Sequence, residues 1–327
     1  MRHVQPDVLV IGAGVIGLSV TAALLEAGLA VTVYAAEPPD RTTSAAAGAL
    51  WGPHLVGADE RVGRWAALTS ARSRELAEAP GTGVAVLTGL AASAGAAGQD
   101  DGPPPFTEGA GEPLRCDPAR LPPGYTAGWR YAAPVIDMVA YLDHLLGLVR
   151  AGGGRLETGP AVPDLAAGLR RRAAPVLVNC AGIGARGLVP DPALVPVRGQ
   201  VVVAANPGLG EFFVGEGADG EVTYIFPHGR TVVLGGTHQH GSASLHADPA
   251  DARRILDRCA AAEPRLARAR VLAHRVGLRP VRPSVRLDAE PAADGRHVVH
   301  CYGHGGAGVT LSWGCALDVA DLIAGLR

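Results

Sequence analysis

Hydrophobic runs near the start of the chain predict two strands joined by a helix. The four apolar residues Val8–Ile11 are typical of a strand buried on both faces of a parallel sheet. A helical pattern follows over 18–26, Gly28 stands where helices commonly stop, and residues 30–34 again have strand character. This order predicts a βαβ unit of about 30 residues.

Two later helices are predicted from apolar positions at helical spacing. Asp137 stands where it would cap the first, which ends at the glycines 152–154, and the second covers about 310–326. The positions expected to face inward are Val139, Leu142, Leu145, Leu146 and Val149 in the first helix and Leu311, Ala316, Val319, Leu322 and Ile323 in the second.

The remaining segments differ in pattern from one another. Buried-type strands are predicted over 175–180 and 298–302, and residues 57–78 are helical in pattern. Residues 91–115 have low complexity and predict a surface loop. The stretch 187–280 is strand-rich, with strands over 200–204, 222–226, 231–234 and 275–280 and one helix over about 249–262.

Composition limits the classes of function. The 327 residues suffice for about two domains. The net charge of −2 argues against nucleic acid or an anionic membrane as the main partner. All 29 basic residues are arginine, so Schiff-base and P-loop chemistry, which need a lysine amine, are excluded.

The five cysteines are scattered and no C-x-x-C occurs, as is typical of reduced thiols in a cytosolic protein. We expect no metal site, since the histidines also lack metal-ligand spacing. The polar N-terminus leaves no room for a signal peptide, and no stretch of about 18 apolar residues lacks glycine or charge. We therefore expect a cytoplasmic protein without a membrane span.

Gly12, Gly14 and Gly17 form a G-x-G-x-x-G pattern between the first strand and helix, the context that a dinucleotide site requires. The first glycine permits the tight turn, the second admits a pyrophosphate, and the third lets helix and strand pack closely. The helix N-terminus, with Val15 and Ile16, offers N–H donors and partial positive charge to a phosphate. A glycine turn without a ligand is the alternative.

Further residues bear on which dinucleotide binds. Glu37, about 20 residues after Gly17, is the candidate for a ribose hydroxyl, or else a solvated loop residue. We find no arginine at that place, which favours NAD or FAD over a 2′-phosphorylated nucleotide. A second strand–loop–helix unit lies at 303–308, and its helix N-terminus could stabilise a reduced flavin. Two such units at opposite ends of the chain favour FAD.

Several separated motifs carry a family resemblance. They are VIGAGVIGLS (10–19), TTSAAAGALW (42–51), VNCAG (178–182), PVRGQ (196–200), GLRPVRP (277–283), YGHGGAGVT (302–310) and WGCA (313–316). In these motifs the chain resembles the D-amino-acid oxidase family over nearly its full length. The resemblance implies FAD and the conversion of a D-amino acid with O2 to a 2-oxo acid, ammonia and H2O2.

The resemblance also implies an α/β fold with a glutathione-reductase-like FAD-binding domain and a mixed-sheet α+β substrate domain. The expected FAD-binding domain is discontinuous, over 1–52, 138–186 and 281–327, and the substrate domain covers 53–137 and 187–280. The partners implied are a small D-amino acid and O2, with no nucleic acid or membrane. A homodimer is left open.

The cofactor residues implied by the resemblance come from three segments. Thr42, Thr43, Gly48 and Ala49 are expected along the flavin phosphates and ring, and Val162 at the adenine. The C-terminal loop and helix are expected to contribute Gly305, Gly306, Gly308, Val309 and Thr310.

Arg279 matches the family arginine that binds the substrate carboxylate. If residues 279–287 are extended, Arg279 shares a face with Val281, Val285 and Leu287. A guanidinium on an apolar face is costly unless an anion meets it, and it can bind a carboxylate through two hydrogen bonds. A structural salt bridge is the alternative.

Tyr224 matches the family tyrosine whose hydroxyl contacts the substrate carboxylate. The alternative is a tyrosine that only packs in the core. The Gly306 carbonyl is expected to hold the substrate amine, so that the α-hydrogen leaves as hydride toward flavin N5. The family often has a second tyrosine four positions before Tyr224, on a loop that covers the site. Gly220 stands there, which predicts a more open mouth and faster product release.

His54 and His238 correspond to places where related D-aspartate oxidases carry basic residues, with polar loop residues as the alternative. We expect neutral D-amino acids as substrates. The alternatives are a D-aspartate or D-glutamate oxidase, more distantly a glycine or sarcosine oxidase, and a flavin-binding protein without turnover.

Overall fold

The computed structural model describes residues 7–52, 54–57, 59–95, 112–171 and 173–326. The helices are α1 (Val15–Glu26), α2 (Arg61–Ala77), α3 (Met138–Ala151), α4 (Leu165–Arg171), α5 (Ala185–Leu188), α6 (Pro249–Ala262) and α7 (Gly308–Gly325). The strands are β1 (Val8–Ile11), β2 (Val31–Ala35), β3 (Val84–Ser93), β4 (Leu114–Arg115), β5 (Ala127–Ile136), β6 (Arg155–Thr158), β7 (Val176–Asn179), β8 (Val195–Ala205), β9 (Phe212–Glu216), β10 (Val222–His228), β11 (Thr231–Gly235), β12 (Gln239–His240), β13 (Val271–Pro291) and β14 (His297–His304).

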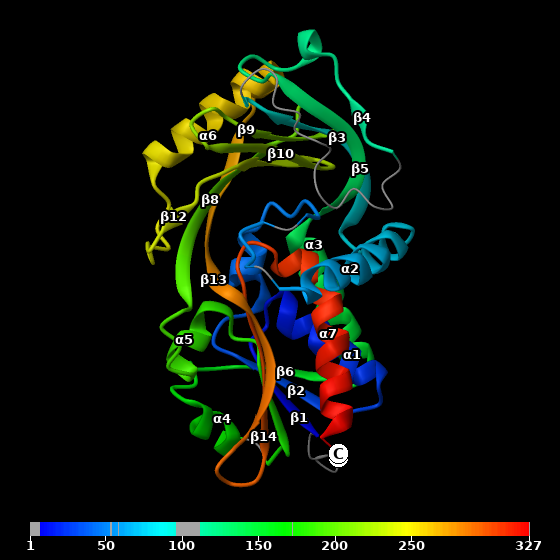
Figure 1. The fold of residues 1–327 in the computed structure, drawn as a ribbon, viewed down its shortest axis with the longest axis vertical. Helices are drawn as coiled ribbons and strands as arrows, with labels where there is room; N and C mark the ends of the chain where they lie inside the picture. Colours follow the sequence, from blue (N-terminus) through cyan, green and yellow to red (C-terminus); the bar gives the residue numbers. More distant parts are fainter. Residues whose placement is uncertain (1–6, 53, 58, 96–111, 172, 327) are drawn as a thin grey trace.

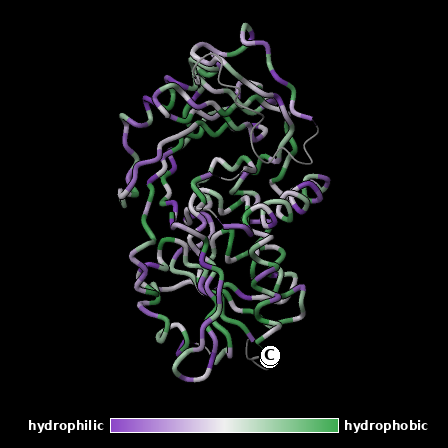
Figure 2. The backbone as a smooth tube through the Cα atoms, in the orientation of Figure 1, coloured by the Kyte–Doolittle hydropathy of each residue, from purple (hydrophilic) through white to green (hydrophobic). Residues whose placement is uncertain are grey.

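A parallel sheet in the order β6-β2-β1-β7-β14 forms one end of the molecule (Figure 1). Alternate residues of β1 serve two cores, because side chains alternate across a strand. Val8 and Val10 pack with residues of α1 and α7, whereas Leu9 and Ile11 pack with Leu169 of α4 and others. The apolar run therefore reflects burial on both faces. The strands of this sheet are largely hydrophobic in Figure 2.

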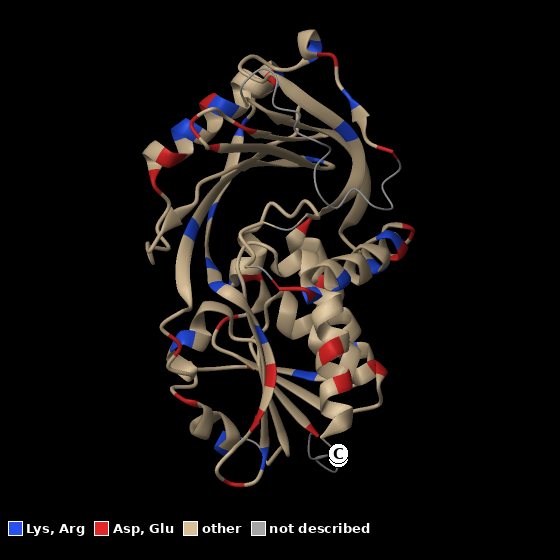
Figure 3. Ribbon diagram, viewed as in Figure 1, with Lys and Arg blue, Asp and Glu red and all other residues tan. Residues whose placement is uncertain are grey.

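The other end is the mostly antiparallel part of the same continuous sheet, in the order β4-β5-β3-β9-β10-β11-β8-β13, and it joins the parallel part where β13 pairs with β14. Helix α6 packs against β8, β10 and β11. Strands β8 and β13 run along the length of the molecule and connect its two ends (Figure 1), and β13 pairs with β8 along one part and with β14 along the other. Charged residues of both signs lie over the outer elements, and basic positions follow β8 and β13 (Figure 3). The α/β fold is confirmed.

Most predicted elements are present, with shifted boundaries. The side chain of Asp137 caps α3 by accepting from the N–H groups of Val139 and Ala140, and α6 has the predicted bounds. Val139 is exposed, so its predicted inward position is wrong, while Met138 and Tyr141 are buried instead. Leu322 is only partly buried.

The predicted loop over 91–115 is wrong at both ends, because β3 extends to Ser93 and Leu114–Arg115 form β4. Residues 96–111 lie outside the described residues. Neither β3 nor β5 was predicted, because their residues do not alternate cleanly between buried and exposed.

The alternation of faces predicted for residues 279–287 is interrupted in β13. The register between β13 and β14 shifts between Val281 and Arg286, so strict alternation does not run from Arg279 to Leu287. Val285 and Leu287 are buried, whereas Val281 is only partly buried.

Helix α2 falls in the segment predicted for the substrate domain, yet it packs against α7. Its Val62, Trp65 and Ala66 belong to the same core as β1 and β2. A boundary directly after residue 52 therefore separates residues that pack together, and the division into two domains stays a prediction.

Within the described part of the chain, one helix, α7, is long and apolar enough to cross a membrane by length and composition alone. Half of it is buried inside the protein, against α1 and α2 among others. Burial in the core therefore accounts for its apolar composition.

Candidate active site

A large cavity of about 600 Å³ lies between the parallel and the antiparallel parts of the sheet. One end is lined by the glycine turn after β1 and by Glu37, and the other by residues of β8, β9, β10 and β13. Residues 41–50 and the 304–310 loop also line it. A volume of this size is within the range of cofactor and ligand sites.

The glycine turn has the shape that the sequence predicts. Gly12 has φ of 111°, and a Cβ there would lie 2.4 Å from the carbonyl oxygen of Cys180. Gly14, Val15 and Ile16 line the cavity, but Gly17 does not. A Cβ on Gly17 would lie 2.0 Å from the Gly12 carbonyl oxygen, so Gly17 allows α1 to pack closely on the turn.

The helix N-terminus has a partner that the sequence analysis missed. Ser44 Oγ accepts a hydrogen bond from the Val15 N–H at 3.0 Å, and Ser44 also lines the cavity. The N–H groups of a helix N-terminus suit an anionic phosphate. Ser44 therefore fixes the 42–47 segment against the phosphate-binding end of α1.

Glu37 and Val162 both line the end of the cavity near β2. Arg41 lines the same cavity, so the prediction that no arginine lies near the ribose, which disfavoured a 2′-phosphate, is weakened. Arg41 is exposed.

The predicted flavin-contacting residues come together along the middle of the cavity. Thr42, Thr43, Gly48 and Ala49 line one part. The C-terminal part consists of Gly305, Gly306, Gly308, Val309 and Thr310. The Thr310 hydroxyl donates to the Gly52 carbonyl at 2.9 Å and ties the start of α7 to the segment after residue 50.

Arg279 lies in β13 beside Val197 of β8, at the end of the cavity away from Glu37. Its Nη1 donates to the Thr237 carbonyl at 2.9 Å, and a Cβ on Gly199 would lie 2.4 Å from Nη1. Within the described ranges no carboxylate lies within 4.0 Å of Arg279, which does not support the alternative of a structural salt bridge. The guanidinium therefore presents an uncompensated charge to the cavity.

Tyr224 of β10 lies at the same end of the cavity. Its ring stacks on Phe226 at a centroid distance of 4.7 Å, and Cβ atoms on Gly235 and Gly236 would lie 2.0 and 2.6 Å from its nearest atoms. Burial raises the pKa of Tyr224, while the positive charge of Arg279 acts in the opposite direction. The hydroxyl is thus a protonated donor at neutral pH.

His54, His238 and Gly306 also line this end. The side chain of His54 is exposed by its accessible surface, yet surrounding protein atoms desolvate its ring. This desolvation, followed by the charges of Arg279 and His238, lowers the pKa of His54 to about 4. His54 is therefore neutral at pH 7.

Gly220 lies in the turn between β9 and β10, with φ of 74°, and it does not line the cavity. A Cβ there would meet no atom within 4 Å. The more open mouth stays a prediction.

All five cysteines are free thiols, as predicted. Two of the cysteines nevertheless lie close to a histidine. The ligand atoms of Cys301, His304 and Cys315 lie within 4.8 Å of one another. Sequence spacing could not show this cluster, because Cys315 belongs to α7 and the other two residues to β14. The expected absence of a metal stays a prediction.

Comparison with known proteins agrees with this geometry. A family model described as FAD dependent oxidoreductase matches residues 7–322. A D-amino-acid oxidase of Rubrobacter xylanophilus is 48% identical over 96% of this chain and 94% of its own length. One of Streptomyces coelicolor is 45% identical over 97% of this chain and 96% of its own.

The chain belongs to the D-amino-acid oxidase family of FAD-dependent oxidoreductases. The fold agrees with a glycine oxidase structure from Geobacillus kaustophilus, with a TM-score of 0.80 and 19% identity over 98% of this chain and 95% of that one. The protein is an FAD-dependent D-amino-acid oxidase. Its cavity is lined by the glycine turn and by the N-terminus of α1, which suit a dinucleotide.

Several residues at the substrate end of this D-amino-acid oxidase were not predicted from the sequence. Gly199 and Thr237 contact Arg279, and Gly199 was already part of the PVRGQ motif. Apolar lining residues of β9 and β10 were also missed. Alternation along the strand predicted over 222–226 could have found Val222 and Phe226, whereas Val214 belongs to β9, which was not predicted.

Proposed function

We propose that this oxidase acts on neutral D-amino acids, with Arg279 and Tyr224 binding the carboxylate. The observation that supports this role is the Arg279 guanidinium, which lines the cavity without a carboxylate partner among the described residues. A planar guanidinium offers several N–H donors, of which the Thr237 carbonyl uses one. The remaining donors suit a bidentate carboxylate.

The neighbouring groups orient the rest of the substrate. The protonated Tyr224 hydroxyl donates to the same carboxylate. The Gly306 carbonyl, at the same end of the cavity, accepts from the amine. With these two groups held, the position of the side chain decides whether the α-hydrogen faces the cofactor, and this selects one enantiomer.

When bound, FAD would supply the two-electron oxidising power of the reaction, with O2 as the final acceptor that becomes H2O2. The protein residues contribute position and electrostatics. Arg279 keeps the carboxylate ionised and fixed, and the surrounding apolar side chains exclude water from the reacting carbon.

The apolar lining supports a neutral side chain in the substrate. Val222, Tyr224 and Phe226 are alternate residues of β10 and line the cavity together with Val214 of β9. His54 and His238 line the same end of the cavity, and the low pKa of His54 leaves it uncharged at pH 7. An acidic side chain would meet no fixed positive charge from His54.

The test is an anaerobic titration of the FAD-loaded enzyme at pH 7.5 with D-alanine, D-valine, D-aspartate, glycine, sarcosine and L-alanine. We expect D-alanine and D-valine to bleach the flavin absorbance and L-alanine to leave it unchanged. D-Aspartate should need a much higher concentration. Faster bleaching by D-aspartate would favour a D-aspartate oxidase, and faster bleaching by glycine or sarcosine would favour an oxidase of that type.

A further inference from the structure

A buried ion pair lies behind the substrate end of the cavity and is not part of its lining. Arg198 of β8 is 2% exposed and Asp251 of α6 is 1% exposed. Arg198 Nη1 lies 3.0 Å from Asp251 Oδ2. Ionised side chains are rarely buried unless they are paired and hydrogen-bonded, so this pair needs an explanation.

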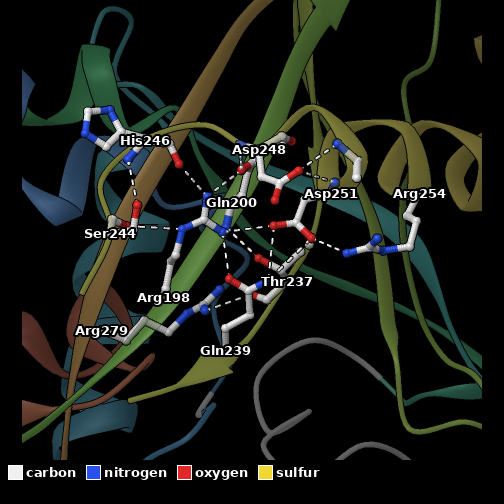
Figure 4. A network of polar contacts seen from close by, with 12 residues as sticks. Arg198, Gln200, Thr237, Gln239, Ser244, His246, Asp248, Asp251, Arg254 and Arg279 are labelled. Carbon is white, nitrogen blue, oxygen red and sulfur yellow. Dashed lines mark hydrogen bonds and ion pairs between the residues drawn. The ribbon is translucent and has the colours of Figure 1, made fainter. Parts of the chain in front are cut away.

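The guanidinium of Arg198 is saturated with acceptors (Figure 4). Besides Asp251, it donates to the side-chain oxygens of Gln200 at 2.7 Å and Gln239 at 2.9 Å. It also donates to the main-chain carbonyls of Ser244 at 3.1 Å and His246 at 2.6 Å. Five hydrogen bonds match the five N–H donors of an arginine.

These contacts hold one segment in place, the chain from Thr237 to Asp248. Gln239 pairs with Arg198 across β12 and β8. Gln200 closes the far end of the segment, since its Nε2 donates to the Asp248 carbonyl and its Oε1 accepts from the Asp248 N–H, each at 2.8 Å. The segment is thus tied to β8 at both ends and to α6 through Asp251.

The first residue of this segment is the one that contacts Arg279. The Thr237 hydroxyl accepts from the Gln200 N–H at 2.9 Å, and the Thr237 carbonyl accepts from Arg279 Nη1 at 2.9 Å. Figure 4 shows Arg279 directed toward Thr237 below the Arg198 cluster. On its other side the Arg279 guanidinium lies against Gly199, the residue between Arg198 and Gln200.

We propose that the Arg198–Asp251 ion pair is a positioning element for substrate binding. It fixes the Thr237 carbonyl, and this carbonyl sets which edge of the Arg279 guanidinium faces the carboxylate. A side chain held in its binding orientation loses less conformational freedom on binding. The inference rests on the proposed role of Arg279.

The test uses the FAD-loaded enzyme and propionate, which is D-alanine without its amino group. Asp251→Asn keeps the side-chain size and removes the charge. We expect the Kd of propionate, read from the flavin absorbance, to rise about tenfold. The KM of D-alanine should rise in parallel while kcat falls by less than about threefold. Asp251→Glu, which keeps the charge, should recover part of the affinity.

Two further variants separate positioning from stability, because removing one partner of a buried pair can unfold a protein. The double variant Arg198→Met/Asp251→Leu replaces both charges by apolar groups, and we expect it to fold and still bind propionate about tenfold more weakly. Thr237→Val removes only the hydroxyl that accepts from Gln200, and should weaken propionate binding about threefold.

A matched control is the Asp318→Asn variant. Asp318 of α7 pairs with Arg64 of α2 and accepts a hydrogen bond from Trp65 Nε1 at 2.7 Å, and none of these three residues lines the cavity. Propionate binding should be unchanged in this variant. A comparable loss of affinity there would show a general effect of charge removal and would overturn the proposal.

Arg279→Met is measured alongside to separate the two hypotheses. Suppose that Arg279→Met loses propionate binding, but the other three variants fold and bind propionate as the parent does. The positioning role of the ion pair is then wrong, and the carboxylate role of Arg279 stands. If Arg279→Met also binds propionate as the parent does, the proposed function of Arg279 is wrong as well.

Discussion

A single methyl group on Gly199 should disable the carboxylate site without unfolding the protein. The Cβ of Gly199→Ala would lie 2.4, 2.5 and 2.6 Å from Nη1, Cζ and Nη2 of Arg279. Contacts this short cannot persist. The backbone of β8 is paired with β11 on one side and β13 on the other, so the guanidinium has to move.

The displacement misaligns the donors that Arg279 presents to the substrate carboxylate. Losing one charge-assisted hydrogen bond to that carboxylate costs about 1.5–3 kcal/mol. This energy corresponds to a fall of about 10- to 150-fold in kcat/KM for D-alanine. Because a flexible side chain moves and the backbone does not, we expect the free energy of unfolding to change by less than about 1 kcal/mol.

The assay is steady-state H2O2 release with D-alanine, together with thermal unfolding of the FAD-loaded enzyme. Gly187→Ala is the matched control, since a Cβ on Gly187 meets no atom within 4 Å. A Gly199→Ala enzyme with parent kinetics would refute the reasoning. So would a variant that loses activity only because it no longer folds or holds FAD.

Three further predictions concern the cofactor, the thiols and pH. Gly17→Ala should lose FAD on gel filtration, because its Cβ would lie 2.0 Å from the Gly12 carbonyl oxygen; full FAD content would contradict this. A thiol reagent at pH 8 should modify the partly exposed Cys116 quickly. It should modify Cys259 only after denaturation, because burial shields this thiol and raises its pKa to about 12. Rapid labelling of Cys259 in the native protein would contradict this. His54 has a pKa of about 4 in the folded protein and about 6.5 in the unfolded chain. Between these two pH values the unfolded chain binds one more proton, so the stability of the folded protein falls as the pH drops from about 6.5 to about 4. His54→Gln should therefore lose less Tm than the parent between pH 7 and pH 5, and an equal loss would contradict this.

Local patterns predicted the nucleotide end of the protein well. The turn at Gly12 follows from a strand, three glycines and a helix that are contiguous in the sequence. The Asp137 cap and the bounds of α6 likewise depend on residues within one turn of each other. Such features need no knowledge of distant contacts.

The substrate end was predictable only in part, because it is assembled from distant segments. Arg279 and Tyr224 were found through the family resemblance, and both line the cavity. Thr237 contributes a main-chain carbonyl, which carries no side-chain signal in a sequence. The partners of Arg198 are similarly invisible, since Asp251 lies 53 positions away and two acceptors are carbonyls.

The account depends on the Arg279 guanidinium holding the substrate carboxylate beside FAD, and stopped-flow reduction of Arg279→Met by D-alanine without O2 tests this directly. The loss of two charge-assisted hydrogen bonds, at about 1.5 kcal/mol or more each, predicts a Kd raised at least about 100-fold. FAD content should be unchanged, because no FAD-binding role is assigned to this side chain. An Arg279→Met enzyme that keeps its FAD and is reduced by D-alanine with the parent's Kd and rate would contradict the account.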